Sequence, residues 1–302
     1  MSLKTSKLPN QIIEKKVSLF QKQPVRLEKP FTFNTNKVVK LRIYPDNRPQ
    51  NMEIAALQKG LVLMVDNTEL IEEGAGFGVP IAKYSDATFF SRTATVYVEE
   101  QDKNAAVIVK VFLLDSVSKK RVHGVFINDD VYSIFHKTFE KAYLRHKNMR
   151  SFFDWVMRLR RTVGIQTCFA YVPPRGKVTI SYHCYPNHIK VCADLSEVDM
   201  TSCREILILN EQGATFFRKH RNDHEVLQDK KVGAWTRVDA KKAEFSDLGE
   251  QISFSMEKRE GATLFCGWEK VKDRFSWAGM TYALSPKTLI FNYTIQLQAN
   301  TD

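Results

Sequence analysis

The sequence predicts a mainly β protein: a large antiparallel two-sheet sandwich, or two β lobes, with an inserted basic helical pair. Two observations predict the β part. Short apolar runs of strand length recur along the chain, and turn segments such as Pro173-Pro174-Arg175-Gly176 separate them. The helical pair is predicted over 128–164, where apolar residues recur every three to four positions. The chain then divides into 1–127, 128–164 and 165–302, with the two β parts expected to form one continuous domain.

The strands follow from the pattern of side chains. Residues 38–44 alternate between apolar and polar types, and 87–99 and 105–115 are rich in β-branched and aromatic residues. Further strands are expected at 60–66, 167–172, 177–185, 189–195, 206–209, 251–256, 262–268, 275–284 and 287–298. Because most of these are short and separated by turns, we expect antiparallel pairing.

Composition limits the class of protein. Of 302 residues, 43% are hydrophobic and 11% aromatic, which supplies a large core and excludes a disordered chain. The sequence contains neither an apolar run typical of a secretory signal nor the roughly 18–20 apolar residues of a membrane span. Five cysteines, an odd number, favour free thiols over a disulfide framework. We therefore expect a cytoplasmic protein without a membrane contact.

The helical pair is expected to begin at Asn128, where Asn and Asp side chains cap a helix, and to end at Gly164. The chain carries a formal charge of +11, and much of the excess lies in this segment. Arg158, Arg160 and Arg161 are the residues that we expect to contact a polyanion. The alternative is that these side chains form only a solvated helix surface.

A glycine-rich segment at 72–80 is the most unusual local stretch. A nucleotide-binding loop is excluded, because Pro80 and a strand-like segment follow the glycines where a helix start is required. Two interpretations remain. Glu72 and Glu73, together with Asp86, could supply catalytic carboxylates for acid–base chemistry on a sugar. Otherwise the segment is a structural reversal with a β-bulge.

A hairpin is predicted at 182–192, turning at Pro186-Asn187. Alternation places Tyr182 and Cys184 on the apolar face and His183 on the other, where His183 is a candidate binding residue. The short paired spacings of structural zinc modules are absent from the sequence, so we expect no metal site.

An aromatic cluster near the end of the sequence is the last candidate. It comprises Phe265, Trp268, Phe275, Trp277 and Tyr282, with Glu269 and Asp273 between them. Aromatic faces beside carboxylates suit sugar rings, so Trp277 is a candidate binding residue. The alternative is that these rings belong to the core.

These candidates lead to ranked hypotheses of function. The first is a protein that binds or processes a sugar-like or phosphorylated small molecule in a β-sheet cleft, without a cofactor. The sequence does not decide whether it is an enzyme. The alternative is a module that uses the basic helical pair to hold nucleic acid or an acidic protein. A third is a subunit whose aromatic surfaces are buried by a partner, and the oligomeric state stays open.

Overall fold

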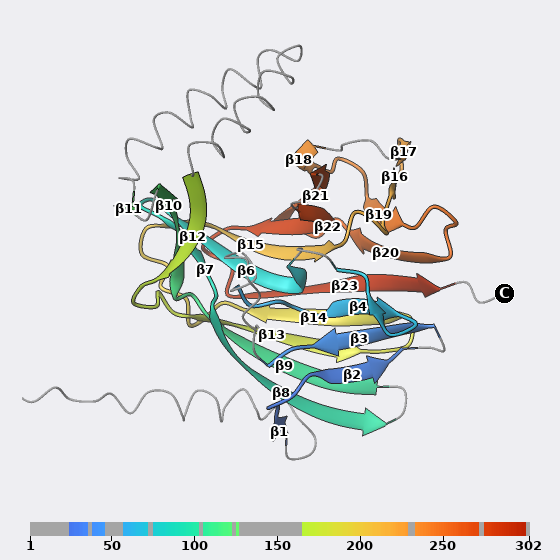
Figure 1. The fold of residues 1–302 in the computed structure, drawn as a ribbon, viewed down its shortest axis with the longest axis horizontal. Coiled ribbons are helices and arrows are strands. Elements are labelled where there is room, and N and C mark those ends of the chain that lie inside the picture. Colours follow the sequence, from blue (N-terminus) through green and yellow to red (C-terminus); the bar gives the residue numbers. More distant parts are fainter. Residues whose placement is uncertain are drawn as a thin grey trace, which may run out of the picture.

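The computed structural model describes residues 24–35, 38–45, 57–71, 75–102, 105–122, 125–126, 165–228, 233–271 and 275–299. Within these ranges the regular structure consists of strands, which form three antiparallel sheets and no helix (Figure 1). The predicted fold class is therefore corrected in two respects. The fold has three sheets where two were expected, and an inserted helical pair is not part of the described structure. Residues 128–164 lie outside the described residues.

The strands pair in the following orders. The ten-stranded sheet runs β1 (Val25–Arg26), β8 (Thr93–Asp102), β9 (Ala105–Leu113), β13 (Lys177–Cys184), β14 (His188–Asp194), β23 (Ile290–Ala299), β20 (Ile252–Glu257), β19 (Lys242–Ser246), β16 (Lys219–Asn222) and β17 (Val226–Gln228). The nine-stranded sheet runs β11 (Val125–Phe126), β10 (Ser116–Val122), β7 (Thr88–Phe90), β6 (Gly76–Tyr84), β15 (Cys203–Gln212), β22 (Phe275–Leu284), β21 (Ala262–Val271) and β18 (Gly233–Arg237), with β12 (Ile165–Tyr171) also paired to β10. The four-stranded sheet runs β2 (Phe31–Asn34), β3 (Val39–Ile43), β4 (Val62–Val65) and β5 (Thr68–Glu69).

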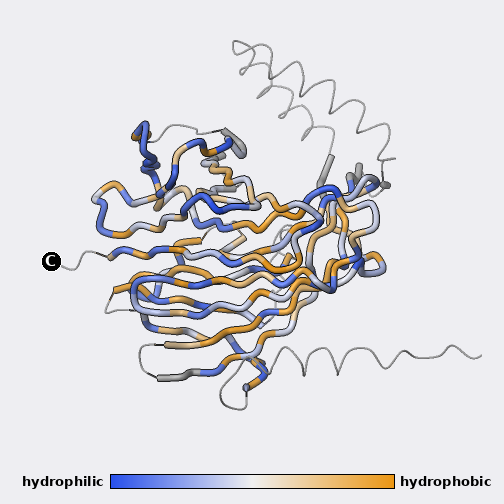
Figure 2. Tube along the Cα trace, turned by 180° about the vertical axis from the view of Figure 1, so that it is seen from behind, coloured by the Kyte–Doolittle hydropathy of each residue, from blue (hydrophilic) through white to orange (hydrophobic). Residues whose placement is uncertain are grey.

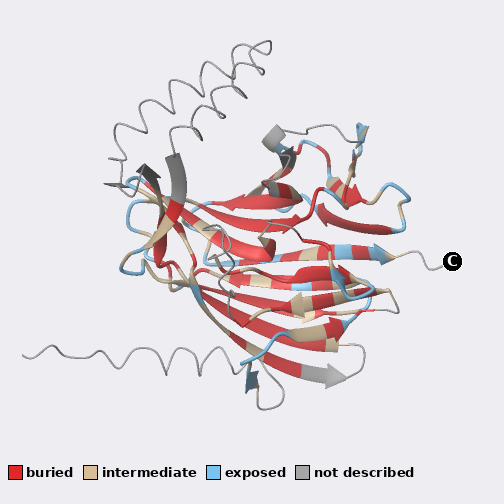
Figure 3. Cartoon of the chain, viewed as in Figure 1, coloured by how far each residue is buried: buried red, intermediate tan, exposed pale blue. Residues whose placement is uncertain are grey.

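The nine- and four-stranded sheets cover the same face of the ten-stranded sheet, so the three sheets make a sandwich of two layers (Figure 1). One continuous apolar core joins all three, with Leu41, Phe112 and Tyr282 as fully or almost fully buried members from each sheet. The strands in the middle of both large sheets are mostly buried (Figure 3). This burial is what holds the layers together.

The third sheet exists because the covering layer is interrupted beside β4. Strand pairing there is reduced to an isolated bridge between Leu61 and Phe77, beside single hydrogen bonds such as that from the Gly60 N–H to the Ala75 carbonyl. Gly76 and Gly78 take positive φ angles of 82° and 79°, and the β6–β15 register shifts between Leu209 and Asn210. Such a bulge bends β6 away from a regular ladder, so β2–β5 pair among themselves. The β-bulge predicted for the glycine-rich segment is thereby confirmed, whereas residues 72–74 of the predicted reversal lie outside the described residues.

Along the strands of the ten-stranded sheet, successive side chains point alternately to its inner and its outer face. Figure 2, the view from behind, shows polar and apolar segments alternating along its strands. The predicted hairpin is confirmed: β13 pairs with β14, and the Tyr185 N–H donates to the His188 carbonyl at 3.0 Å. Tyr182 and Cys184 point into the core, while His183 is half-buried on the opposite face.

Lys110 is an exception on the inner face of β9. Its side chain is fully buried, and its Nζ donates to the main-chain carbonyls of Tyr44 at 2.9 Å and Lys59 at 2.7 Å. A buried ammonium requires such acceptors. Lys110 therefore joins the ten-stranded sheet to the four-stranded one.

Two further expectations can be compared with the structure. The five cysteines carry free thiols, as predicted, and Cys168, Cys184 and Cys266 are buried. In the described part of the chain, no helix is long and apolar enough to cross a membrane.

Candidate functional site

Asp86, a predicted catalytic carboxylate, lies in the turn between β6 and β7. Its two oxygens accept from the Arg175 guanidinium at 2.6 and 3.2 Å. The same guanidinium lies 4.6 Å from the Tyr84 ring centre and 5.0 Å from that of Phe89. Asp86 is thus held in a two-point ion pair that connects the β6–β7 turn to the segment before β13.

Glu72 and Glu73 lie outside the described residues, so the structure gives no geometry for their carboxylates. The next residue that is described, Ala75, precedes β6, whereas Asp86 follows that strand. At about 3.4 Å per residue, the two ends of β6 are roughly 25–30 Å apart. Asp86 is therefore remote from Ala75.

The predicted binding residues also lie apart. His183 is on the outer face of the ten-stranded sheet, beside its cross-strand partner Lys190. Burial, and then the Lys190 charge, lower the pKa of His183. Trp277 is on the outer face of the nine-stranded sheet, which is the other side of the sandwich. Arg158, Arg160 and Arg161 lie outside the described residues.

The structure instead identifies a carboxylate that the sequence analysis missed. Glu211 is near the end of β15, between Asn210 and Gln212, whose side chains point inward and are fully buried. Glu211 points outward, yet only 9% of it is exposed. Its Oε2 accepts from the Ala75 N–H at 2.9 Å. Burial raises the pKa of Glu211 to about 7, although the Ala75 hydrogen bond acts in the opposite direction.

Glu211 lies in a row of residues that crosses the nine-stranded sheet. It pairs with Gly76 on β6 and with Gly279 on β22, and Gly279 pairs with Gly267 on β21. Directly opposite residues of an antiparallel pair share a face. Glu211 is therefore the only residue of these four with a side chain beyond hydrogen.

Two tryptophans adjoin this row. Trp277 precedes Gly279 by two residues and so shares its face, with its Cα about 7–8 Å diagonally from that of Glu211. Trp235 lies in β18, where the pairing to β21 shifts register between Gly233 and Thr236. The rings of Trp235 and Trp277 stack with centroids 4.7 Å apart and planes 29° from parallel. We call Glu211, Trp235 and Trp277 the tryptophan–glutamate face.

Trp235 adopts a φ angle of 53°, in the left-handed region. This conformation is unfavourable for a bulky side chain, by roughly 1–3 kcal/mol, and is held only by its surroundings. The register shift in β18 is the local cause, since Ala234 and Trp235 lie between two paired positions where β21 has the single residue Gly267. The result is that the indole is turned onto Trp277.

This arrangement has a definite chemical capacity. A carboxyl group with a pKa of about 7 is part protonated at neutral pH, so it can both donate and accept hydrogen bonds. Half-buried indole rings offer apolar surface and an N–H donor. A sugar-like ring fits this pair of features, because its hydroxyl groups can bond to the carboxyl group and its apolar C–H faces can pack on the indoles.

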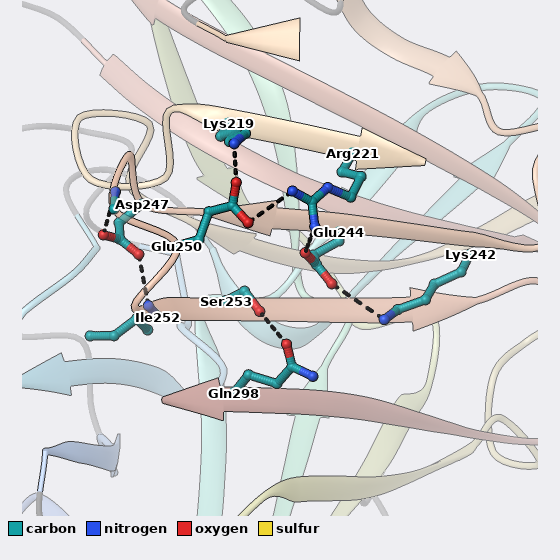
Figure 4. A network of polar contacts seen from close by, with 10 residues as sticks. Lys219, Arg221, Lys242, Glu244, Asp247, Glu250, Ile252, Ser253 and Gln298 are labelled. Atoms are coloured by element: carbon teal, nitrogen blue, oxygen red, sulfur yellow. Dashed lines mark hydrogen bonds and ion pairs between the residues drawn. The ribbon is translucent and has the colours of Figure 1, made fainter. Parts of the chain in front are cut away.

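The outer face of the ten-stranded sheet carries a second polar cluster, shown in Figure 4. Glu250 pairs with Lys219 and accepts from Arg221 at 2.8 Å, while Glu244 accepts from Lys242 at 3.3 Å. The two cations lower the pKa of Glu250. Since these charges pair with one another, the cluster is a surface ion-pair network that connects β16, β19 and the 247–251 turn.

Metal chemistry finds no support in the described ranges, where no three His, Cys, Asp or Glu side chains gather as ligands would.

Sequence reasoning missed Glu211 because it ends an apolar run, Ile206 to Leu209, that is typical of a buried strand. The available signal was the polar triplet 210–212 followed by Gly213. Polar residues that continue a buried strand are expected to be buried too, and buried polar side chains need hydrogen-bond partners. Those partners are distant in sequence; Ala75 is 136 residues away.

Comparison of the chain with protein-family models and with curated proteins gives no match.

Proposed function

We propose that this protein binds a sugar-like ring on the tryptophan–glutamate face. The observation that carries the proposal is the strained Trp235, stacked on Trp277 beside an almost buried carboxyl group. The C–H face of a pyranose would pack on the exposed indole surface, and its hydroxyl groups would exchange hydrogen bonds with Glu211.

Binding is proposed ahead of catalysis. Hydrolysis of a glycosidic bond commonly uses two carboxyl groups on either side of the bond. Glu211 supplies one, with a pKa suited to a general acid. Glu72 and Glu73 come shortly before Ala75 in the sequence and are the candidates for a second. Asp86 takes no part in this proposal, because it is remote from Ala75 and paired with Arg175.

The test is a titration of tryptophan fluorescence with a panel of neutral sugars and sugar phosphates, each at low and high salt. Binding to the wild-type protein is expected to be nearly independent of salt, since the described contacts are stacking and hydrogen bonds. Trp277→Ala should weaken the affinity about three- to tenfold, the range expected for loss of one aromatic contact.

Trp268→Phe is the matched control. Trp268 is on the same sheet but its indole N–H donates to the Phe217 carbonyl at 2.9 Å, and its cross-strand partner Ala278 is fully buried. It should therefore keep the wild-type affinity. Equal losses in both variants, or shifts produced only by polyanions at low salt, would rule out the sugar site.

A further inference from the structure

The Glu211 carboxylate is connected to the opposite layer of the sandwich by a chain of hydrogen bonds. The chain passes through the β6 bulge, which contains Gly76 to Gly78. From the core side, a hydroxyl group of β13 contacts the bulge directly, and one of β23 contacts Asn210, which in turn binds the bulge; both strands are in the ten-stranded sheet. This inference rests on the proposed function, because it concerns the regulation of the same face.

Asn210 fixes the bulge from one side. Its Oδ1 accepts from the Gly78 N–H at 3.0 Å and from the Tyr293 hydroxyl at 2.9 Å. Its Nδ2 donates to the Ile208 carbonyl at 3.1 Å, so both ends of the amide are engaged. Asn210 and Tyr293 are fully or almost fully buried, and an unpaired amide in such surroundings would lower the stability of the fold.

Tyr182 fixes the bulge from the other side. Its hydroxyl donates to the Phe77 carbonyl at 2.8 Å and lies 3.3 Å from the Gly78 carbonyl. A Cβ atom at position 78 would approach that hydroxyl oxygen to 2.6 Å. The glycine is required here both for its φ angle and for this close approach.

The bulge in turn fixes Ala75. Gly76 is the first residue of β6, and the Ala75 carbonyl accepts from the Gly60 N–H at 2.8 Å. The Ala75 carbonyl fixes the peptide unit that follows the Ala75 Cα, and the N–H on the other side of that Cα donates to Glu211. Loosening the bulge would release that N–H.

We propose that Tyr182 and Asn210 are positioning residues that hold the Ala75 N–H on the Glu211 carboxylate. Neither side chain lies on the tryptophan–glutamate face, because both point into the core. Tyr182 acts from the ten-stranded sheet, and Asn210 on β15 is itself held by Tyr293 of that sheet. The ten-stranded sheet therefore affects how a carboxyl group on the outer side of the other layer is hydrogen-bonded.

The experiment follows the titration of Glu211 by carbon-13 NMR of its side-chain carboxyl carbon, in sugar-free protein, with Glu211→Gln used to assign the signal. Tyr182→Phe removes the hydroxyl and keeps the ring. The Glu211 pKa should rise by about 0.5 unit, because the Ala75 hydrogen bond favours the ionised form.

Tyr282→Phe is the matched control. Its buried hydroxyl donates to the Glu257 carbonyl, away from the bulge, and its ring packs on Tyr293. The Glu211 pKa should stay at the wild-type value in this variant. Tyr293→Phe gives a second test should Tyr182→Phe fail to fold, since it removes a donor to Asn210 and should raise the pKa in the same direction.

An unchanged Glu211 titration in Tyr182→Phe and Tyr293→Phe, or an equal shift in Tyr282→Phe, would overturn the inference. The measurement needs no sugar, so its outcome is separate from that of the proposed function. A pKa shift without sugar binding would reject the function alone, and sugar binding without the shift would reject the positioning role alone.

Discussion

Replacing Glu211 by Gln should remove a specific part of the dependence of stability on pH. Gln has the same size and keeps an oxygen that can accept from the Ala75 N–H, but it does not titrate. In the folded protein the Glu211 pKa is about 7, against an ordinary value of 4.5. The folded state therefore retains a proton that the unfolded state releases.

The sign follows from proton binding. Below about pH 4.5 the group is protonated in both states, and above about pH 7 it is ionised in both. Between these values the folded state binds more protons, so the free energy of unfolding falls as pH rises. At about 1.4 kcal/mol per pKa unit, the difference amounts to about 3 kcal/mol. This stabilisation is present in acid and lost by about pH 7.

This pH-dependent stabilisation can be measured by urea unfolding at closely spaced pH values from 4 to 8. The wild-type protein and Glu211→Gln are compared at each pH. Every other titrating group is common to both proteins, so the difference between the two free energies isolates Glu211. The wild type should lose about 3 kcal/mol relative to the variant across this range. A difference that is constant with pH would refute the buried, neutral carboxyl group.

Three further changes test the fold. Gly78→Ala should lower the free energy of unfolding by about 2 kcal/mol or more, as seen by thermal denaturation, because the methyl group meets the Tyr182 hydroxyl in a left-handed conformation; a neutral effect would contradict the bulge. Lys110→Met should cost about 2 kcal/mol or more in urea unfolding, since two main-chain carbonyls lose a charged donor, and wild-type stability would contradict that contact. Ellman's reagent should modify at most the half-buried Cys192 and Cys203 in the native protein and all five thiols after unfolding; rapid reaction of a third native thiol would contradict the burial described.

The parts of the fold that the sequence predicted best are those with a clear alternation. The strand expected at 275–284 is β22, with the same bounds, and the 182–192 hairpin has its predicted faces. In the hairpin one face is fully buried, so its apolar side chains recur at every second position of the sequence.

Strands at the sheet margins were missed because they bury few side chains. In β16 only His220 is buried, and its neighbours Lys219 and Arg221 join the ion-pair network of Figure 4. This strand is defined by its backbone pairing with β19. Such pairing between separate segments cannot be recognised from the amino-acid composition of either one.

The candidate site was predictable only in part. Trp277 was identified because aromatic residues cluster near it, whereas Trp235 depends on a register shift that no local pattern encodes. Glu211 becomes unusual only when β6 and β22 flank it with glycines. The burial that raises its pKa is likewise a property of the assembled sheet.

The position of β23 has a consequence for synthesis of the protein. It is the last described strand in the sequence, but it pairs with β14 on one side and β20 on the other, in the interior of the ten-stranded sheet. While the ribosome is still making the chain, β14 and β20 each present an open hydrogen-bonding edge to other nascent chains. Such edges favour aggregation. This layer is therefore completed only after β23 has been made, and premature termination before residue 290 would leave β14 and β20 without the strand that joins them.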